Sequence, residues 1–225
     1  MKEFLELLAH LHTPEGIENL IRTGGLLALI FVVFAETGLL IGFFLPGDSL
    51  LVTAGVLSSR SLNGGAPILN IWTINLALMT AAVLGDQVGF FLGRKTGPKI
   101  FSKPDNRFFK KKYALEAHAF YEKHGGKAII LARFVPIMRT FVPFIAGVAD
   151  MSYKNFVTYN VFGGIGWVFS MTMLGYFLGR SPWGEKLHLI IMVVIFISIM
   201  PMVIGLLKRW FSGSPETSSA VKRPD

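Results

Sequence analysis

The stretch AIILARFVPIMRTFVPFIAGV, residues 128–148, decides the fold class of this chain. It is apolar enough to enter a membrane, yet Arg133 and Arg139 interrupt it, three residues on either side of Pro136. Proline removes a backbone N–H and breaks helices, so Pro136 and Pro143 predict two short arms instead of one spanning helix. A charge at the bilayer centre costs about 2.5–3.5 kcal/mol on insertion scales, and such a residue usually marks a pathway or a binding site.

The surrounding sequence has the composition of a polytopic all-α membrane protein. The 225 residues are 52% hydrophobic and only 16% charged, which is too apolar for an ordinary soluble domain. Four further apolar runs each approach the ~20 residues that cross a bilayer as a helix. These runs are Leu26–Leu45, Ile71–Leu92, Phe156–Leu178 and Leu187–Leu207.

The net charge of +8 is concentrated in the 94–127 segment, which contains ten Lys/Arg and only three Asp/Glu, and in the tail after Leu207. Basic loops beside membrane spans follow the positive-inside rule, so we expect both segments in the cytoplasm and expect no nucleic-acid partner. The expected organisation is an amphipathic N-terminal helix in residues 1–23, a membrane domain in 24–210 and a disordered tail in 212–225. Within the membrane domain we expect a first repeat in 24–94, a basic loop in 95–125, a second repeat in 126–180 and a final span in 187–207.

Two sequence elements recur in the same order, some 85–90 residues apart. The first is FLPGDSLLVTAGV, residues 44–56, which matches FVPIMRTFVPFIAGV, residues 134–148, with two extra residues. The second is GFFLGR, residues 89–94, which matches GYFLGR, residues 175–180. Pro46 and Gly47 in the first copy correspond to Pro136 in the second, so both copies predict a broken segment.

The charge pattern predicts that the two repeats are inverted relative to each other. If residues 127–148 enter and leave on one side, Arg94 ends its span inside and Arg180 ends its span outside. Inverted repeats with broken segments are typical of transporters that bind substrate near the bilayer midplane. We therefore predict two re-entrant helical hairpins that face each other. The side of the N-terminus stays open, since Leu26–Leu45 can either cross or form a hairpin arm.

The first repeat carries acid, at Glu36 and Asp48, and the second carries base, at Arg133 and Arg139. Guanidinium groups offer a planar fork of donors that suits phosphate, which makes the two arginines candidate phosphate ligands. Carboxylates in a low-dielectric site favour their neutral form unless a cation compensates, so the acids are candidate proton carriers or counter-ions. Asp86 joins this set, either directly or as a hydrogen-bonding group for a hairpin.

A static interpretation of the same residues remains open at this point. The acids and arginines can simply neutralise one another and fix the hairpins, in which case breaking a pair costs stability and not transport. The Gly163-Gly164-Ile-Gly166 segment predicts close helix packing and not a nucleotide loop. The five histidines fall mostly on expected surface helices, so we predict no metal site and no cofactor.

These strings resemble the DedA family of membrane proteins, which carry the SNARE-associated or VTT domain. The resemblance covers about residues 24–210. It rests on FAETG (34–38), FLPGDSL (44–50), GD (85–86), FYEKHGG (120–126) and ARFVPIMRTF (132–141), and it extends through Gly147, Met151-Ser-Tyr and Tyr159-Asn160.

The resemblance implies a bacterial inner-membrane protein with two re-entrant hairpins, in which Glu36, Asp48, Arg133 and Arg139 match functionally essential positions. Family members support envelope integrity, cell division and resistance to cationic antimicrobials, and they depend on the proton motive force. Bacterial members are implicated in returning undecaprenyl phosphate across the membrane and others in moving phosphatidylethanolamine, while eukaryotic relatives are phospholipid scramblases.

We therefore expect a lipid transporter and not an enzyme, whose partners are a membrane lipid and protons, with a homo-oligomer left open. The expected substrate is undecaprenyl phosphate, recycled with the help of the proton motive force. The alternatives are a phospholipid flippase or scramblase, a proton-coupled small-ion antiporter and, least favoured, a membrane lipid phosphatase.

Overall fold

A computed structural model describes residues 14–40, 45–59, 69–101 and 126–182, together with 189, 192 and 193. All regular structure in these ranges is helical. The helices are α2 (Pro14–Gly38), α3 (Gly47–Ser59), α4 (Ile71–Phe101), α6 (Lys127–Ala132), α7 (Pro136–Val148) and α8 (Tyr153–Arg180). The predicted tail, most of the basic loop, most of the last span and the first half of the N-terminal helix lie outside the described residues.

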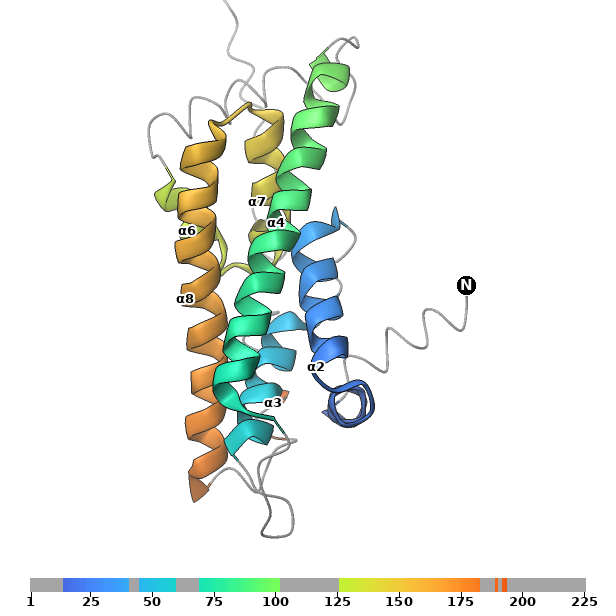
Figure 1. Cartoon of the computed structure of the whole chain (residues 1–225), viewed down its shortest axis with the longest axis vertical. Coiled ribbons are helices and arrows are strands. Elements are labelled where there is room, and N and C mark those ends of the chain that lie inside the picture. Colours follow the sequence, from blue (N-terminus) through green and yellow to red (C-terminus); the bar gives the residue numbers. More distant parts are fainter. Residues whose placement is uncertain are drawn as a thin grey trace, which may run out of the picture.

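Two long helices form the frame of the molecule, and they run side by side in opposite directions (Figure 1). Each contains a 28-residue apolar segment that is long enough to cross a membrane, at Ile71–Pro98 in α4 and Tyr153–Arg180 in α8. The predicted spans in these two regions are therefore helical throughout. Helix α4 continues to Phe101, beyond residue 95 where the basic loop is predicted to start, and Gly93 and Gly97 pack on α7.

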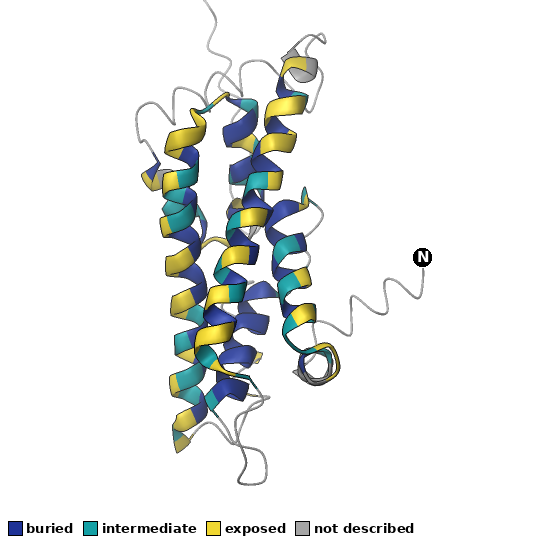
Figure 2. Ribbon diagram, in the orientation of Figure 1, coloured by how far each residue is buried: buried dark blue, intermediate teal, exposed yellow. Residues whose placement is uncertain are grey.

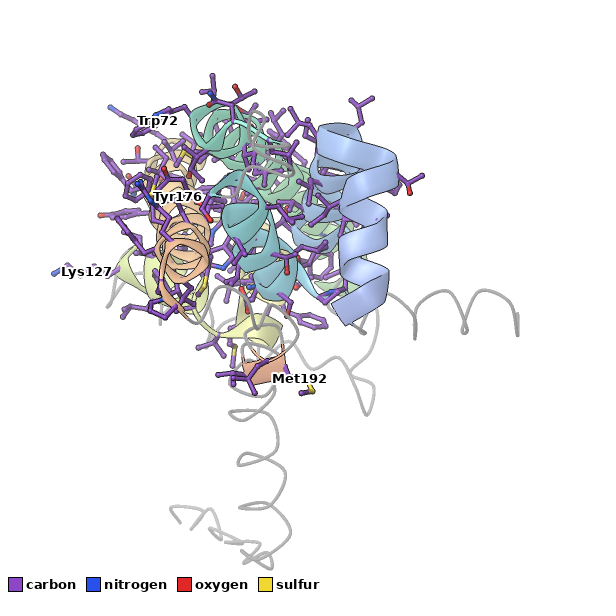
Figure 3. The ribbon with its side chains drawn as sticks, turned by 90° about the horizontal axis from the view of Figure 1, so that it is seen from below. Trp72, Lys127, Tyr176 and Met192 are labelled. Atoms are coloured by element: carbon purple, nitrogen blue, oxygen red, sulfur yellow. The ribbon has the colours of Figure 1, made fainter. Side chains whose placement is uncertain are left out.

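The two short helices α3 and α7 each contain 13 residues, about 20 Å of helix, which is less than the ~30 Å hydrocarbon core of a bilayer. Both begin near the middle of the molecule and run toward opposite ends (Figure 1). Helix α3 packs mainly on α8, whereas α7 packs mainly on α4. Seen along the long axis, α3 lies among α2, α4 and α8 (Figure 3).

Helix α2 contains a kink at Gly25, whose φ of +56° is left-handed and suits glycine. The kink coincides with the predicted end of the N-terminal helix. Beyond it the helix ends at Gly38, so the prediction that Leu26–Leu45 could form one spanning helix is wrong. The apolar segment Thr23–Gly38 is shorter than a bilayer crossing, which favours the alternative of a hairpin arm.

The two prolines of the 128–148 stretch behave differently. Pro136 stands at the start of α7, after a break at residues 133–135, and proline is well suited to the first turn because its missing N–H needs no partner there. Pro143 lies inside α7, so its predicted role as a hairpin break is wrong. It removes a single N–H, toward the carbonyl of Arg139, and the helix continues across it because α7 packs along α4. Pro46 immediately precedes α3, and Gly47 is its first residue.

Glycines bring each short helix into backbone contact with a long one. A Cβ at Gly147 of α7 would overlap the carbonyl oxygen of Phe90 in α4, and a Cβ at Gly55 of α3 would overlap that of Thr172 in α8. Gly55 and Gly147 occupy matching places in the repeated sequence. Each repeat's short helix therefore packs on the long helix of the other repeat.

Alanine at these glycines is expected to force the helices apart. Overpacking typically costs about 1–3 kcal/mol, so Gly55→Ala and Gly147→Ala should each lower the melting temperature of the detergent-solubilised protein. Gly166→Ala is the matched control on α8, because a Cβ there meets nothing within 4 Å and alanine favours a helix by about 1 kcal/mol. A Gly147→Ala protein that melts like the control would contradict the observed packing.

Burial follows this arrangement (Figure 2). Helix α3 is buried on all sides from Gly47 to Ser58, as expected for a helix enclosed by others. The outer faces of α2, α4 and α8 instead expose large apolar side chains, including Phe31, Trp72 and Phe162. In Figure 3 the labelled Trp72 and Lys127 lie at the periphery and point away from the helices. Such an apolar belt fits a protein whose outer surface faces lipid.

Candidate functional site

Every buried charged side chain in the described residues belongs to one site. The five are Glu36, Asp48, Asp86, Arg133 and Arg139, and none is more than 7% exposed. They come from α2, α3, α4, the break before α7, and α7 itself. The fold thus brings together all five of the charged residues that the sequence singled out inside apolar runs.

Arg139 joins the two short-helix regions. Its Nη2 donates to Glu36 Oε1, and its Nη1 donates to Asp48 Oδ1 at 2.5 Å. The two carboxylates are on α2 and α3, while the arginine is on α7, so one guanidinium ties residues more than 90 positions apart. Charge-assisted hydrogen bonds of this kind are among the strongest in proteins.

The first turns of α3 and α7 meet at this arginine. Asp48 is the second residue of α3 and Arg139 the fourth residue of α7, and the two side chains are in contact. A Cβ at Gly47 would overlap the Glu36 carboxylate, so that carboxylate lies against the start of α3. Helix N-termini carry partial positive charge and free N–H groups, and both features favour an anion.

Arg133 forms a second ion pair with a different set of partners. Its Nη2 donates to Asp86 Oδ2 on α4 and to Asn160 Oδ1 on α8, and Asn160 donates in turn to the carbonyl of Val83 at 3.1 Å. Arg133 therefore fastens the break before α7 to the two long helices, whereas Arg139 fastens α7 to α2 and α3.

Gly163 of α8 has a role that the sequence did not predict. A Cβ at Gly163 would lie 3.2 Å from Cγ of Arg133, whereas a Cβ at Gly164 would lie 3.1 Å from Cγ2 of Val83 in α4. The predicted close helix packing holds at these two positions, since Gly163 also approaches the backbone of Ile130. In addition, the absence of a side chain at Gly163 leaves room for the side chain of Arg133 across α8.

Trp167 of α8 completes the site. Its indole N–H donates to Asp48 Oδ1 at 2.8 Å, and the guanidinium carbon of Arg139 lies 4.5 Å from its ring centroid. Sequence reasoning missed Asn160 and Trp167. An amide inside the apolar run Phe156–Leu178, and a tryptophan far from either end of it, were the signals that could have found them.

Two donors in the site have no partner in the described part of the chain. Arg133 Nη1 and Arg139 Nε are buried and make no hydrogen bond. Buried polar groups normally have partners, so each of these N–H donors can give a hydrogen bond to an oxygen of a bound anion. The site thus combines unused cationic donors with two helix N-termini, which is the chemistry that binds phosphate or carboxylate.

The site also contains more acid than base. Three carboxylates face two guanidinium groups, which gives one formal negative charge if every group is ionised. An uncompensated buried charge is costly, so one bound proton would bring the cluster to neutrality.

Comparison with known proteins identifies the family of this chain. Residues 45–177 match the VTT domain. The chain is 47% identical to protein DedA of Escherichia coli over 182 residues, which are 80% of this chain and 81% of that one.

Two further relatives extend the comparison. One is a membrane protein of Mycobacterium tuberculosis, 45% identical over 84% of this chain and 82% of its own. The other is the inner membrane protein YqjA of Escherichia coli, 36% identical over 75% and 74%. No solved structure matches the chain. With its apolar frame of two long helices and this extent of identity, the chain is a membrane protein of the DedA family, defined by the VTT domain.

Proposed function

We propose that this protein carries the phosphate headgroup of a membrane lipid across the bacterial inner membrane, and that the lipid is undecaprenyl phosphate. The observation that carries the proposal is the position of Arg139. Its guanidinium is buried where the first turns of α3 and α7 meet, and it is held by two carboxylates. An anion can take the place of these carboxylates, and a proton can neutralise them.

The proposed architecture is an inverted repeat with two re-entrant hairpins, one formed by α2 and α3 and the other by α6 and α7. Support comes from the short helices, which run from mid-molecule toward opposite ends, and from the matching glycines Gly55 and Gly147. Irregular backbone at membrane depth is tolerated only inside protein or beside water, and the residues Gly47 and Asp48 at the start of α3 and Arg133 in the break before α7 are buried. In this arrangement the basic loop and the C-terminus are cytoplasmic.

Phosphate is proposed to bind between the hairpins. Arg139 would supply the fork that its carboxylates now occupy, and Arg133 would add its unpartnered Nη1. Arginine suits this task because its planar donors match two oxygens of one phosphate group. The polyprenyl chain would stay in lipid, so only the headgroup needs a polar path. No covalent bond changes, and we propose no enzymatic activity.

Protons are proposed to control access to Arg139. Protonation of Glu36 or Asp48 removes an ionic partner from the arginine and frees donors for phosphate, and deprotonation restores the ion pairs and expels it. Asp86 acts as the counter-ion of Arg133. Moving one proton through 100 mV yields about 2.3 kcal/mol, or about 50-fold in an equilibrium, which is enough to bias this competition.

Headgroup translocation in proteoliposomes tests the proposal. The purified protein should move undecaprenyl phosphate between leaflets, and an imposed pH gradient should change the rate about 10-fold or more. Phosphatidylethanolamine added in excess should compete poorly. Equal movement of both lipids without a pH effect would indicate a scramblase, proton flux without lipid an antiporter, and release of inorganic phosphate a phosphatase. Each of these results would contradict the proposal.

A further inference from the structure

Trp167 touches both sides of the charged site although it belongs to neither short helix. It is fully buried in α8 and is among the largest enclosed side chains in the described residues. Its N–H bonds Asp48 of α3, and its ring lies against Arg139 of α7. One side chain of a long helix thus contacts the acid and the base that join the two short-helix regions.

The indole ring of Trp167 does not contact Arg139 through the N–H groups that bind the carboxylates. Glu36 and Asp48 bind the N–H groups along the edge of the guanidinium, and an incoming phosphate would bind the same edge. The indole instead approaches the group within reach of a cation–π interaction, 4.5 Å from ring centroid to Cζ. Carboxylate and phosphate therefore compete for the N–H groups of Arg139, and neither of them competes with the ring for its contact.

Trp167 also contacts one of the carboxylates that would compete with phosphate for Arg139. Asp48 Oδ1 accepts both the indole N–H and Arg139 Nη1, so these two donors share one oxygen. When Arg139 leaves that oxygen for another anion, Trp167 can keep both its hydrogen bond to Asp48 and its contact with the cation. The arginine then has one partner that is the same before and after exchange.

We propose that Trp167 is a positioning residue, which holds the Arg139 guanidinium in place for the phosphate group while the carboxylates release it. This inference rests on the proposed function, since it assumes that Arg139 exchanges carboxylate for phosphate. It adds a role for α8, because Trp167 on this long helix supplies a fixed contact for Arg139 of α7 and Asp48 of α3 while these two residues exchange partners.

Binding of dodecyl phosphate to the full-length protein in detergent tests the role of the ring. Loss of the aromatic face in Trp167→Leu should weaken binding about 10–30-fold, because no fixed contact would then hold the Arg139 guanidinium in place for phosphate once the carboxylates release it. Trp167→Phe keeps an aromatic face, although a smaller one, and loses the N–H, so it should bind within about 3-fold of the parent. Trp72→Leu, at the exposed surface of α4, is the matched control and should bind like the parent.

Fluorescence gives a readout that does not require a substitution at Trp167. In a protein with Trp72, Trp183 and Trp210 replaced by phenylalanine, Trp167 is the remaining tryptophan of the four. Dodecyl phosphate should change its emission, because a phosphate bound to Arg139 alters the charge beside the ring even though the ring keeps its own contacts, and the further change Arg139→Lys should remove that response. Unchanged emission at saturating dodecyl phosphate would contradict the proposal, whether or not the leucine variant folds.

The failures of the two proposals can be told apart. If dodecyl phosphate does not bind the parent protein, the phosphate site itself is wrong. If it binds the parent and a folded Trp167→Leu variant equally, only the positioning role is wrong. Equal weakening by leucine and phenylalanine would also contradict it, since the hydrogen bond and not the aromatic face would then matter.

Discussion

Replacing Arg139 with alanine is expected to lower headgroup transport in proteoliposomes at least about 100-fold and to destabilise the protein by about 3–5 kcal/mol. The reason is the geometry of its guanidinium, which is divided between Glu36 on α2 and Asp48 on α3. Without it, two buried carboxylates lose their shared cation, and α7 loses its ionic link to the other hairpin. Transport rates and melting temperatures measured on one preparation give both effects.

The substitution Arg139→Lys separates the effect of the positive charge from the effect of the planar guanidinium shape. A lysine restores the positive charge, so most of the lost stability should return, but its compact ammonium cannot reproduce the planar fork. We expect transport to stay about 10-fold or more below the parent rate. Arg180→Ala is the matched control, because Arg180 is exposed at the end of α8. A folded Arg139→Ala protein that moves undecaprenyl phosphate like the parent would refute the site.

Replacing Asp86 with alanine is expected to cost about 3–5 kcal/mol of stability, because it leaves the Arg133 guanidinium buried without its carboxylate. Asn160 still accepts one hydrogen bond from Arg133, but a neutral amide does not compensate the charge. Thermal unfolding in detergent measures the loss. Asp150→Asn, which removes the exposed charge that pairs with Arg94 and tolerates the left-handed backbone there (φ +53°), should cost less than about 1 kcal/mol.

A double variant decides between a static and a functional role for this pair. Asp86→Leu combined with Arg133→Met removes both charges and fills their space with apolar atoms, an exchange that is often neutral or stabilising. We expect the double variant to melt close to the parent and to have lost transport. Recovery of both stability and transport would show that the pair is only structural.

The sequence was sufficient to identify the charges of the site. Glu36, Asp86 and Arg133 stand out because each interrupts an apolar run, and the cost of burying charge makes such residues informative on their own. The long helices and the break at Pro136 were also predictable, since hydropathy over about 20 residues and the chemistry of proline are local properties. The end of α2 at Gly38 and the continuity of α7 through Pro143 were not, because packing on α4 overrides the local signals there.

By itself the sequence determined that this chain is a helical membrane protein with buried acid and base in repeated, broken segments. Only the tertiary structure decided that Arg133 pairs with Asp86 and Arg139 with Glu36 and Asp48, and that α8 supplies Asn160 and Trp167 to the two arginines. The physical reason is that these partners are 27 to 103 residues apart along the chain. Composition and spacing reveal which side chains are costly to bury, but helix packing selects the partner that compensates each one.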